Sequence, residues 1–337
     1  YNRSQFFTVT KAHMNRRQFS QSAVTALAVA LSGNVLAQSG PYPNRTVKII
    51  APVAPGGGVE LVARTVAEPL QRALGQTFIV ENMSGGGGVI ASQATLRAAP
   101  DGYTLMLGYV ATHGTNPAMR NIPYNAVNDF TPIAMVAGTP NVLVVGAGVA
   151  ASNVKELVAL AKKTPLNFGT AGQGSLTHLL VEQFKLAVDI QATHAPYRGI
   201  TPAITDVLGG QTQFMMPGLA AALQHIKSGK LRPLAVTGSK RHAALPDAPT
   251  FEELGFKGFT AVQWYGIVGP AKLPAPIVVK LNEEINKAIN SPELRERLSG
   301  EALEPMPMTS AAFGAFIEAE VARWTKLVRE RNIEVNA

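Results

Sequence analysis

Glycine-rich segments stand directly before three stretches with a helical pattern, at residues 54–58, 84–88 and 170–175. The first N–H groups of a helix have no intrahelical partner, and the helix dipole favours negative charge beside them. Glycine also lets another molecule approach the main chain closely, although any single run would equally fit a tight turn. The three runs together predict that backbone amides bind an anion here without needing a cationic side chain.

A few side chains close to these segments could add to this chemistry. Glu60 follows the first glycine run, where a carboxylate suits the helix dipole but would repel an anion. We interpret Glu60 as a helix cap or as a clamp for a ligand amine. His178 could reach a ligand from the first turn of its helix, whereas His194 is assigned a structural role. Three aromatic side chains could line a cleft, although core packing is favoured for each: Tyr109, Trp264 and Tyr265.

The residue spacings of known phosphate-binding, dinucleotide-binding, nucleophile and metal-binding motifs are absent. The first glycine run lacks the Gly-Lys-Ser/Thr of a phosphate-binding loop, and the dinucleotide pattern G-x-G-x-x-G fails at Leu61, Ile90 and Thr177. No G-x-S-x-G nucleophile elbow occurs, and the six histidines show no H-E-x-x-H or similar ligand spacing. The sequence therefore predicts no catalytic residue, no metal site and no cofactor.

Strand-like and helix-like segments alternate along the chain, which predicts an α/β fold with parallel sheets. Two clusters of such segments separate near residues 138–142, so we predict two lobes. Lobe 1 comprises residues 41–138 plus 240–337, and lobe 2 comprises residues 139–239. In open α/β sheets, ligands bind beyond the carboxyl ends of the strands, and that is where the glycine runs fall.

Helix starts and apolar faces give several local predictions. Ser152, Ser175, Ser291 and Thr309 are expected N-caps, and Pro69 is expected to kink or shorten its helix. One predicted apolar face comprises Val279, Leu281, Ile285 and Ile289. The strongest predicted face, with steps of three and four, comprises Phe313, Phe316, Ile317, Val321, Trp324, Leu327 and Val328.

Residues 1–37 are predicted to be a leader. From Met14, the first plausible start, Arg16-Arg17 precede an apolar run at residues 23–31 and a small-residue cleavage site between Ala37 and Gln38. The run is shorter than the roughly 20 residues of a membrane-spanning helix. The paired arginines resemble a twin-arginine export signal, although general secretion also tolerates them.

The composition narrows the possible partners. The net charge is +8, but four of the 30 basic residues lie in the leader, so the remainder has 26 against 22 acidic residues. Those charges are scattered, and we expect no nucleic-acid partner. The chain has no cysteine, which excludes disulfides and thiolate chemistry.

Short motifs along nearly the whole chain after the leader resemble the solute receptors of tripartite tricarboxylate transporters, the Bug-type family. The matching segments, in order, are 42–43, 54–58, 63–64, 75–76, 80–82, 99–105, 140–144, 167–172 with Ser175 and His178, 196–197, 208–211, 229–232 and 245–250. The resemblance implies a type II periplasmic-binding-protein (Venus-flytrap) fold with a ligand cleft between the lobes. Three positions depart from the usual pattern of the family, which favours Asp at Glu60, Arg at Met83 and a polar or acidic residue near Pro217.

The resemblance also implies which residues bind the ligand. Family members hold a carboxylate with main-chain amides of the first and third glycine segments, helped by waters. The corresponding residues here are Ala54, Pro55, Gly56, Gly57, Gly58, Thr170, Ala171, Gly172, Gly174, Ser175 and His178.

The function expected from the resemblance is that of a periplasmic, monomeric receptor, not an enzyme. It would deliver a di- or tricarboxylate, an aromatic acid or an acidic amino acid to the membrane permease subunits of a transporter. Presentation of the same ligand to a membrane sensor kinase is an alternative. An enzyme on the same fold is a third hypothesis, which would require a positioned acid, base or nucleophile.

Overall fold

The computed structural model describes residues 41–56, 58–330 and 333. The predicted leader and its cleavage site between Ala37 and Gln38 lie outside the described residues. Residues 41–44 form a segment of their own with a cis peptide bond between Tyr42 and Pro43. In the part of the chain that the structure describes, no helix is both long and apolar enough to cross a membrane.

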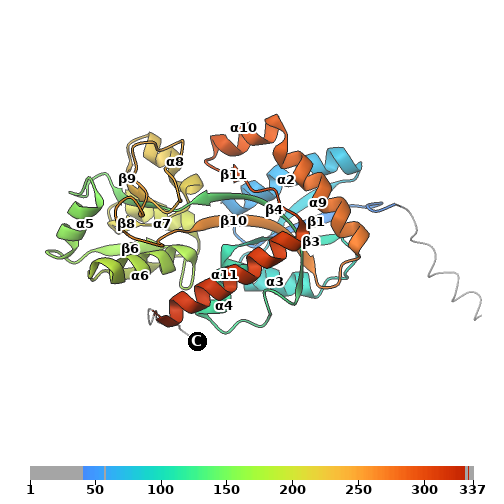
Figure 1. The fold of residues 1–337 in the computed structure, drawn as a ribbon, viewed down its shortest axis with the longest axis horizontal. Helices are drawn as coiled ribbons and strands as arrows, with labels where there is room; N and C mark the ends of the chain where they lie inside the picture. The colour runs from blue at the N-terminus through green and yellow to red at the C-terminus, as the bar shows by residue number, and fades with distance from the viewer. Residues whose placement is uncertain (1–40, 57, 331–332, 334–337) are drawn as a thin grey trace, which may run out of the picture. The chain divides into compact units, whose positions relative to one another are not determined.

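The first sheet has six strands among the described residues, in the order β11-β4-β10-β3-β1-β2 (Figure 1). β1 is parallel to both β2 and β3, whereas β10 is antiparallel to β3 and β4, and β11 is antiparallel to β4. The strands are β1 Val47–Ala51, β2 Phe78–Asn82, β3 Thr104–Tyr109, β4 Phe130–Pro140, β10 Val262–Pro270 and β11 Glu304–Pro305.

The second sheet has five strands among the described residues, in the order β7-β6-β8-β5-β9. β6 is parallel to β7 and β8, and β5 is antiparallel to β8 and β9. The strands are β5 Val142–Gly146, β6 Asn167–Thr170, β7 Thr193–Pro196, β8 Phe214–Met215 and β9 Leu231–Val236. Both sheets are therefore mixed, and the prediction of parallel sheets was wrong.

The mixed pairing arises because the chain passes directly from one sheet to the other. Only Asn141 separates β4 from β5, and β10 runs antiparallel to β4 in the region between the two sheets (Figure 1). Thr237 ties the crossing segments together, since its N–H donates to Asn141 O and its hydroxyl donates to Ala261 O, at 2.9 and 2.8 Å. The exact lobe boundaries stay a prediction.

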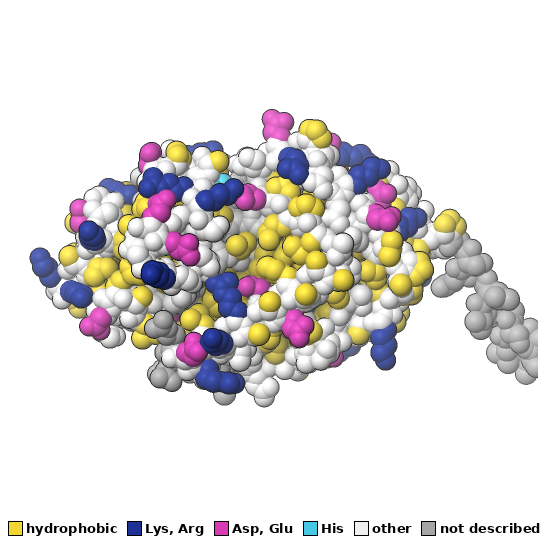
Figure 2. Space-filling model, viewed as in Figure 1, with side chains coloured by type: hydrophobic (Ala, Val, Ile, Leu, Met, Phe, Trp, Pro, Cys, Tyr) yellow, Lys and Arg dark blue, Asp and Glu magenta, His cyan; other side chains and the backbone are white. Residues whose placement is uncertain are grey.

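Helices pack on both sheets. Those associated with the first sheet are α2 Gly58–Leu74, the 3-10 turn η1 Gly86–Gly88, α3 Val89–Leu96, the π-helical turn η2 Ala111–Thr115, α4 Asn116–Met119, α9 Ala275–Asn290, α10 Pro292–Gly300 and α11 Ser310–Glu330. The second sheet carries α5 Val154–Ala161, α6 Leu176–Val188, α7 Ile200–Leu208 and α8 Leu219–Lys227. On the face shown in Figure 2, basic and acidic side chains are interspersed rather than gathered by sign.

Most local helix predictions are confirmed. Ser175 and Ser291 are N-caps, with each side chain accepting from the N–H three residues later. The predicted face of α11 turns inward, with its residues buried or half-buried against the core. Trp264 and Tyr265 also lie in the core, on β10, as the favoured interpretation held.

Two local predictions were wrong, and a third was wrong in part. Asn153, not Ser152, is the N-cap of α5, because its side-chain oxygen accepts from Glu156 N at 2.9 Å. Val278 is buried in α9 while Val279 is 53% exposed, since residue 278 continues the inward-facing step of three before Leu281. Pro69 was expected to kink or shorten α2; it does not shorten the helix, which continues to Leu74, and a kink stays a prediction.

Candidate ligand-binding site

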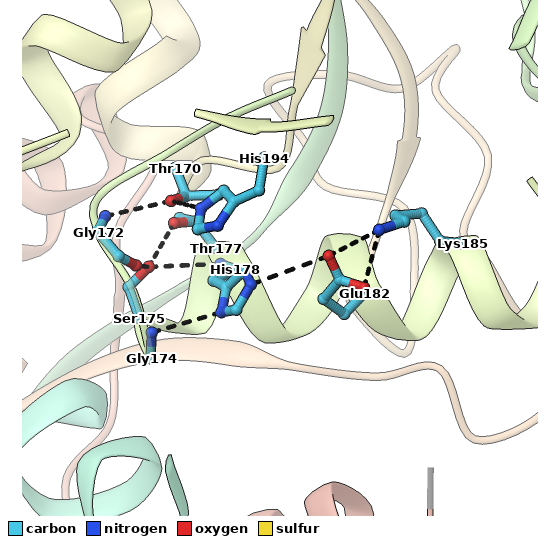
Figure 3. Close-up of polar contacts among 9 residues, drawn as sticks. All are labelled: Thr170, Gly172, Gly174, Ser175, Thr177, His178, Glu182, Lys185 and His194. Atoms are coloured by element: carbon cyan, nitrogen blue, oxygen red, sulfur yellow. Dashed lines mark hydrogen bonds and ion pairs between the residues drawn. The ribbon is translucent and has the colours of Figure 1, made fainter. Parts of the chain in front are cut away.

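The third glycine segment joins β6 to α6 and is held in shape by hydroxyl groups (Figure 3). Ser175 Oγ donates to Gly172 O at 2.7 Å and accepts from His178 N at 3.3 Å, which caps α6 and closes the turn before it. Thr177 Oγ1 lies 2.8 Å from Ser175 Oγ and accepts from Ala171 N at 2.9 Å. These hydrogen bonds fix the conformation of the loop and so hold the start of α6 in one position.

Four of the third-segment amides predicted to bind an anion already have partners, among them Gly174 N, which donates to His178 Nδ1, and Ser175 N, which donates to Gly172 O. Ala171 N donates to the Thr177 hydroxyl, and Gly172 N donates to Thr170 Oγ1 at 3.2 Å. The N–H of Gln173, a residue that the sequence reasoning passed over, donates to no acceptor among the described residues. The first N–H of α6, that of Leu176, is likewise open in the described part of the chain. These open amides are the ones that an anion can use.

His178 and His194 form a stacked pair beneath this loop, with ring centroids 4.1 Å apart. Burial, reinforced by the charge of Lys185, lowers the pKa of His178 to about 4. Burial and the charge of His178 lower the pKa of His194 to about 4 as well. Both rings are therefore neutral at pH 7.

The hydrogen bonds of the two rings hold the loop. Gly174 N donates to His178 Nδ1 at 3.4 Å, and His194 Nε2 lies 2.7 Å from Thr170 Oγ1 (Figure 3). His178 is only 5% exposed, so its visible role is to support the loop. The structural role assigned to His194 agrees with its contacts, and direct ligand contact by His178 stays a prediction.

The first glycine segment follows β1 and leads into α2. Ala54, Pro55 and Gly56 are exposed, and Gly57 lies outside the described residues. Gly58 is approached by the phenol of Tyr265, whose oxygen would lie 3.3 Å from a Cβ added at residue 58. A side chain at this position would press on β10, so glycine suits the start of α2.

The Glu60 carboxylate occupies one amide of the first segment, that of Gly56. Gly56 N donates to Glu60 Oε2 at 2.7 Å, and Arg64 Nε donates to Glu60 Oε1 at 2.8 Å. The Gly56 N–H, followed by the Arg64 guanidinium, lowers the pKa of Glu60, so the carboxylate is charged at pH 7. These contacts agree with the interpretation of Glu60 as a cap, and its anionic charge is balanced by Arg64.

The second glycine segment meets the third through Arg120, which the sequence reasoning missed. Arg120 Nη1 donates to Gly86 O at 3.1 Å, and its Nη2 donates to Gln173 O. Gly88 at φ +95° must be glycine, since an added Cβ would lie 2.4 Å from Thr112 Cγ2. No sequence pattern marks Arg120 as a site residue, because it follows a π-helical turn and a single short helix, which have no regular residue spacing. The two glycine segments therefore lie on either side of one guanidinium group.

The surroundings offer little for other chemistry. Among the described residues, no three His, Asp or Glu side chains gather in a way that could hold a metal ion. Three titratable side chains beside the loops, Glu60, His178 and His194, are engaged in hydrogen bonds that hold the loops. The arrangement suits binding by amides and one cation.

Two mixed α/β sheets joined by crossing strands, with glycine loops facing each other at the helix starts, define a two-lobed periplasmic-binding-protein fold. A solved structure of the periplasmic binding protein BugD is similar, with a TM-score of 0.81 and 34% identity, covering 87% of this chain and 99% of that one. The structure of R. palustris Rpa4515 with adipate has a TM-score of 0.84 and 31% identity, covering 87% and 99%.

The family follows from the sequence comparisons. Residues 62–333 match the family described as the tripartite tricarboxylate transporter family receptor. BugT of Bordetella pertussis is 36% identical over 314 residues, which cover 91% of this chain and 96% of BugT. The chain belongs to this family of receptors, as its motifs indicated.

Proposed function

We propose that this chain is a periplasmic receptor that binds a small carboxylate between its lobes and delivers it to the permease subunits of a tripartite tricarboxylate-type transporter. The observation that carries the proposal is the meeting of two glycine segments at Arg120, next to the open amides at the start of α6. The adipate in Rpa4515, a similar structure, supports a carboxylate as the ligand class.

The proposed chemistry is non-covalent capture. The N-terminus of a 13-residue helix and unpartnered N–H groups favour an anion, and each amide–carboxylate bond contributes about 1.5–3 kcal/mol. The first-segment residues proposed from the sequence, including Ala54, Pro55 and Gly56, are expected to contact the same ligand, and this contact stays a prediction. We propose no catalysis, because Glu60, His178 and His194 are occupied in holding the loops.

The test is a thermal-shift screen of the chain against matched carboxylates and acidic amino acids. A ligand that binds only the folded state at about 100 times its dissociation constant adds about 2.7 kcal/mol of stability. For a protein of this size we expect a rise in Tm of several degrees. No shift with any mono-, di- or tricarboxylate or acidic amino acid would refute the proposal. Size-exclusion chromatography of the same sample tests the expected monomer.

Replacement of Ser175 separates the loop's structural role from its binding role. Ser175→Ala removes the N-cap of α6 and the bond to Gly172 O, so we expect a loss of about 1 kcal/mol in unfolding free energy. Binding of the carboxylate found in the screen should weaken roughly tenfold, because the loop is no longer held in its binding shape.

Ser291→Ala is the matched control, since Ser291 caps α10 in the same way but away from the loops. It should lose similar stability without losing affinity. Equal affinity losses in the two variants would mean that the Ser175 loop has no special part in binding. Urea unfolding and isothermal titration calorimetry measure the two quantities.

A further inference from the structure

Arg120 lies where the two glycine segments approach each other. Its guanidinium donates to Gly86 O from the first-sheet side and to Gln173 O from the second-sheet side. Glycines leave room for it on both sides: a Cβ added at Gly87 would lie 3.2 Å from Nη1, and one at Gly174 would lie 2.9 Å from Nη2. Gly174, at φ +75°, also adopts a conformation that other residues avoid. The backbone of both loops is therefore shaped around this cation.

The charge of Arg120 has only neutral partners in the described part of the chain. Both of its hydrogen-bond acceptors are carbonyl oxygens, and no described Asp or Glu forms an ion pair with it. Arg64, beside the first segment, is different because Glu60 pairs with it at 2.7 Å. Arg120 is half-buried, so solvent screens its charge only in part. The site thus has a positive charge that an anion can neutralise.

The guanidinium also has donors to spare. It carries five N–H groups, and its bonds to Gly86 O and Gln173 O use two of them. Its planar fork matches a carboxylate, which can accept two parallel hydrogen bonds from it. The two carbonyls hold the group in place before any ligand arrives, which reduces the entropy lost on binding.

We propose that Arg120 binds the second carboxylate of a dicarboxylate ligand and makes this receptor prefer dianions over monoanions. The first carboxylate takes the open amides at Gln173 and Leu176, and the guanidinium beside Gln173 O takes the second. This inference rests on the proposed function, because it assigns the ligand class of the same site. Dicarboxylate selectivity then comes from one side chain rather than from a cluster of cations.

The experiment compares dicarboxylates with monocarboxylates of equal length by calorimetry: succinate with butyrate, glutarate with pentanoate, and adipate with hexanoate. Wild type should bind at least one dicarboxylate more tightly than its monocarboxylate partner. Arg120→Gln should raise the Kd of that dicarboxylate about 10- to 100-fold, the range of a charged hydrogen-bonded contact, and leave the monocarboxylate Kd within about twofold. Arg120→Lys should recover part of the loss, since the charge returns without the fork.

Arg97→Gln is the matched control, because it removes the same charge from an exposed position after α3. It should change neither Kd, and thermal unfolding of every variant confirms that it is folded. Equal losses for both members of a pair in Arg120→Gln would show that Arg120 only links the loops, and would overturn the proposal. Equal wild-type affinity for both members of every pair would also overturn it. No binding of any of the six acids would instead count against the proposed carboxylate function.

Discussion

Replacing Glu320 by alanine is expected to cost roughly 4 kcal/mol of unfolding free energy. Glu320 is 7% exposed, and its Oε2 accepts from both Trp264 Nε1 at 3.1 Å and Trp324 Nε1 at 3.0 Å. Both tryptophans are fully buried, so alanine leaves two indole N–H groups without an acceptor and a space beside them. An unsatisfied buried donor costs about 1–3 kcal/mol, and the space adds to that.

Two further variants separate the stability contributed by the Glu320 oxygen acceptor from the effect of placing alanine in α11. Glu320→Gln keeps one oxygen acceptor, so we expect about half the loss of the alanine variant. Glu318→Ala, two residues earlier and exposed on α11, is the control and should change stability by no more than about 0.5 kcal/mol. Urea unfolding followed by tryptophan fluorescence measures all three. A loss below about 1 kcal/mol in Glu320→Ala would contradict this account of the core.

Acid is expected to destabilise the protein through its buried histidines. Burial lowers the pKa of His113 to about 3, and its fully buried ring packs 4.5 Å from that of Phe130. The Nδ1 atom lies 2.8 Å from Thr112 Oγ1, while Nε2 has no hydrogen-bond partner among the described residues. A proton added to this ring would place an unpaired charge in the core.

The direction of the effect follows from the two pKa values. Below the unfolded value of about 6.5, the unfolded chain binds a proton that native His113 does not, so stability falls as pH drops towards about 3. Between pH 7 and pH 5 the loss is roughly 2 kcal/mol for His113. His178, whose pKa burial lowers to about 4, should add a loss of similar size over the same range.

Urea unfolding at pH 5, 6 and 7 tests this prediction with His113→Asn and His178→Asn. The slope of unfolding free energy against pH reports how many more protons the unfolded state binds than the native state. Each variant should lower that number by close to one. The value at pH 7, where the wild-type rings are neutral, reports the packing lost in each substitution separately. If the unfolding free energy of both variants depends on pH as steeply as that of the wild type, other groups cause the acid sensitivity.

The sequence could predict features that depend on neighbours a few residues away. Ser175 and Ser291 were identifiable as caps because the accepting side chain and the donating N–H lie three positions apart. The inward face of α11 follows from its steps of three and four. The glycine segments and the ordered motifs of the receptor family are also read directly from the chain.

The local apolar pattern of the sequence could not predict whether neighbouring strands are parallel or antiparallel. β10 pairs with β3 and β4, which lie more than 120 residues earlier, and either direction would satisfy the same apolar pattern. The chain also passes from β4 in the first sheet to β5 in the second with only Asn141 between the two strands, and no local pattern marks this change of sheet. Pairing between distant strands is decided by how the whole chain packs, which is why the parallel prediction failed.

The sequence alone thus determined the helix caps, the amphipathic faces, the glycine segments and the family, since these depend on residue type and short spacing. Only the tertiary structure decided which amides of the third segment are already bonded, and that Arg120 lies between Gly86 O and Gln173 O. It also decided that the acidic side chain of Glu320 is buried, because the fold brings Trp264, which lies 56 residues earlier in the sequence, against it. A side chain's polar partners and burial depend on which distant segments the fold brings beside it.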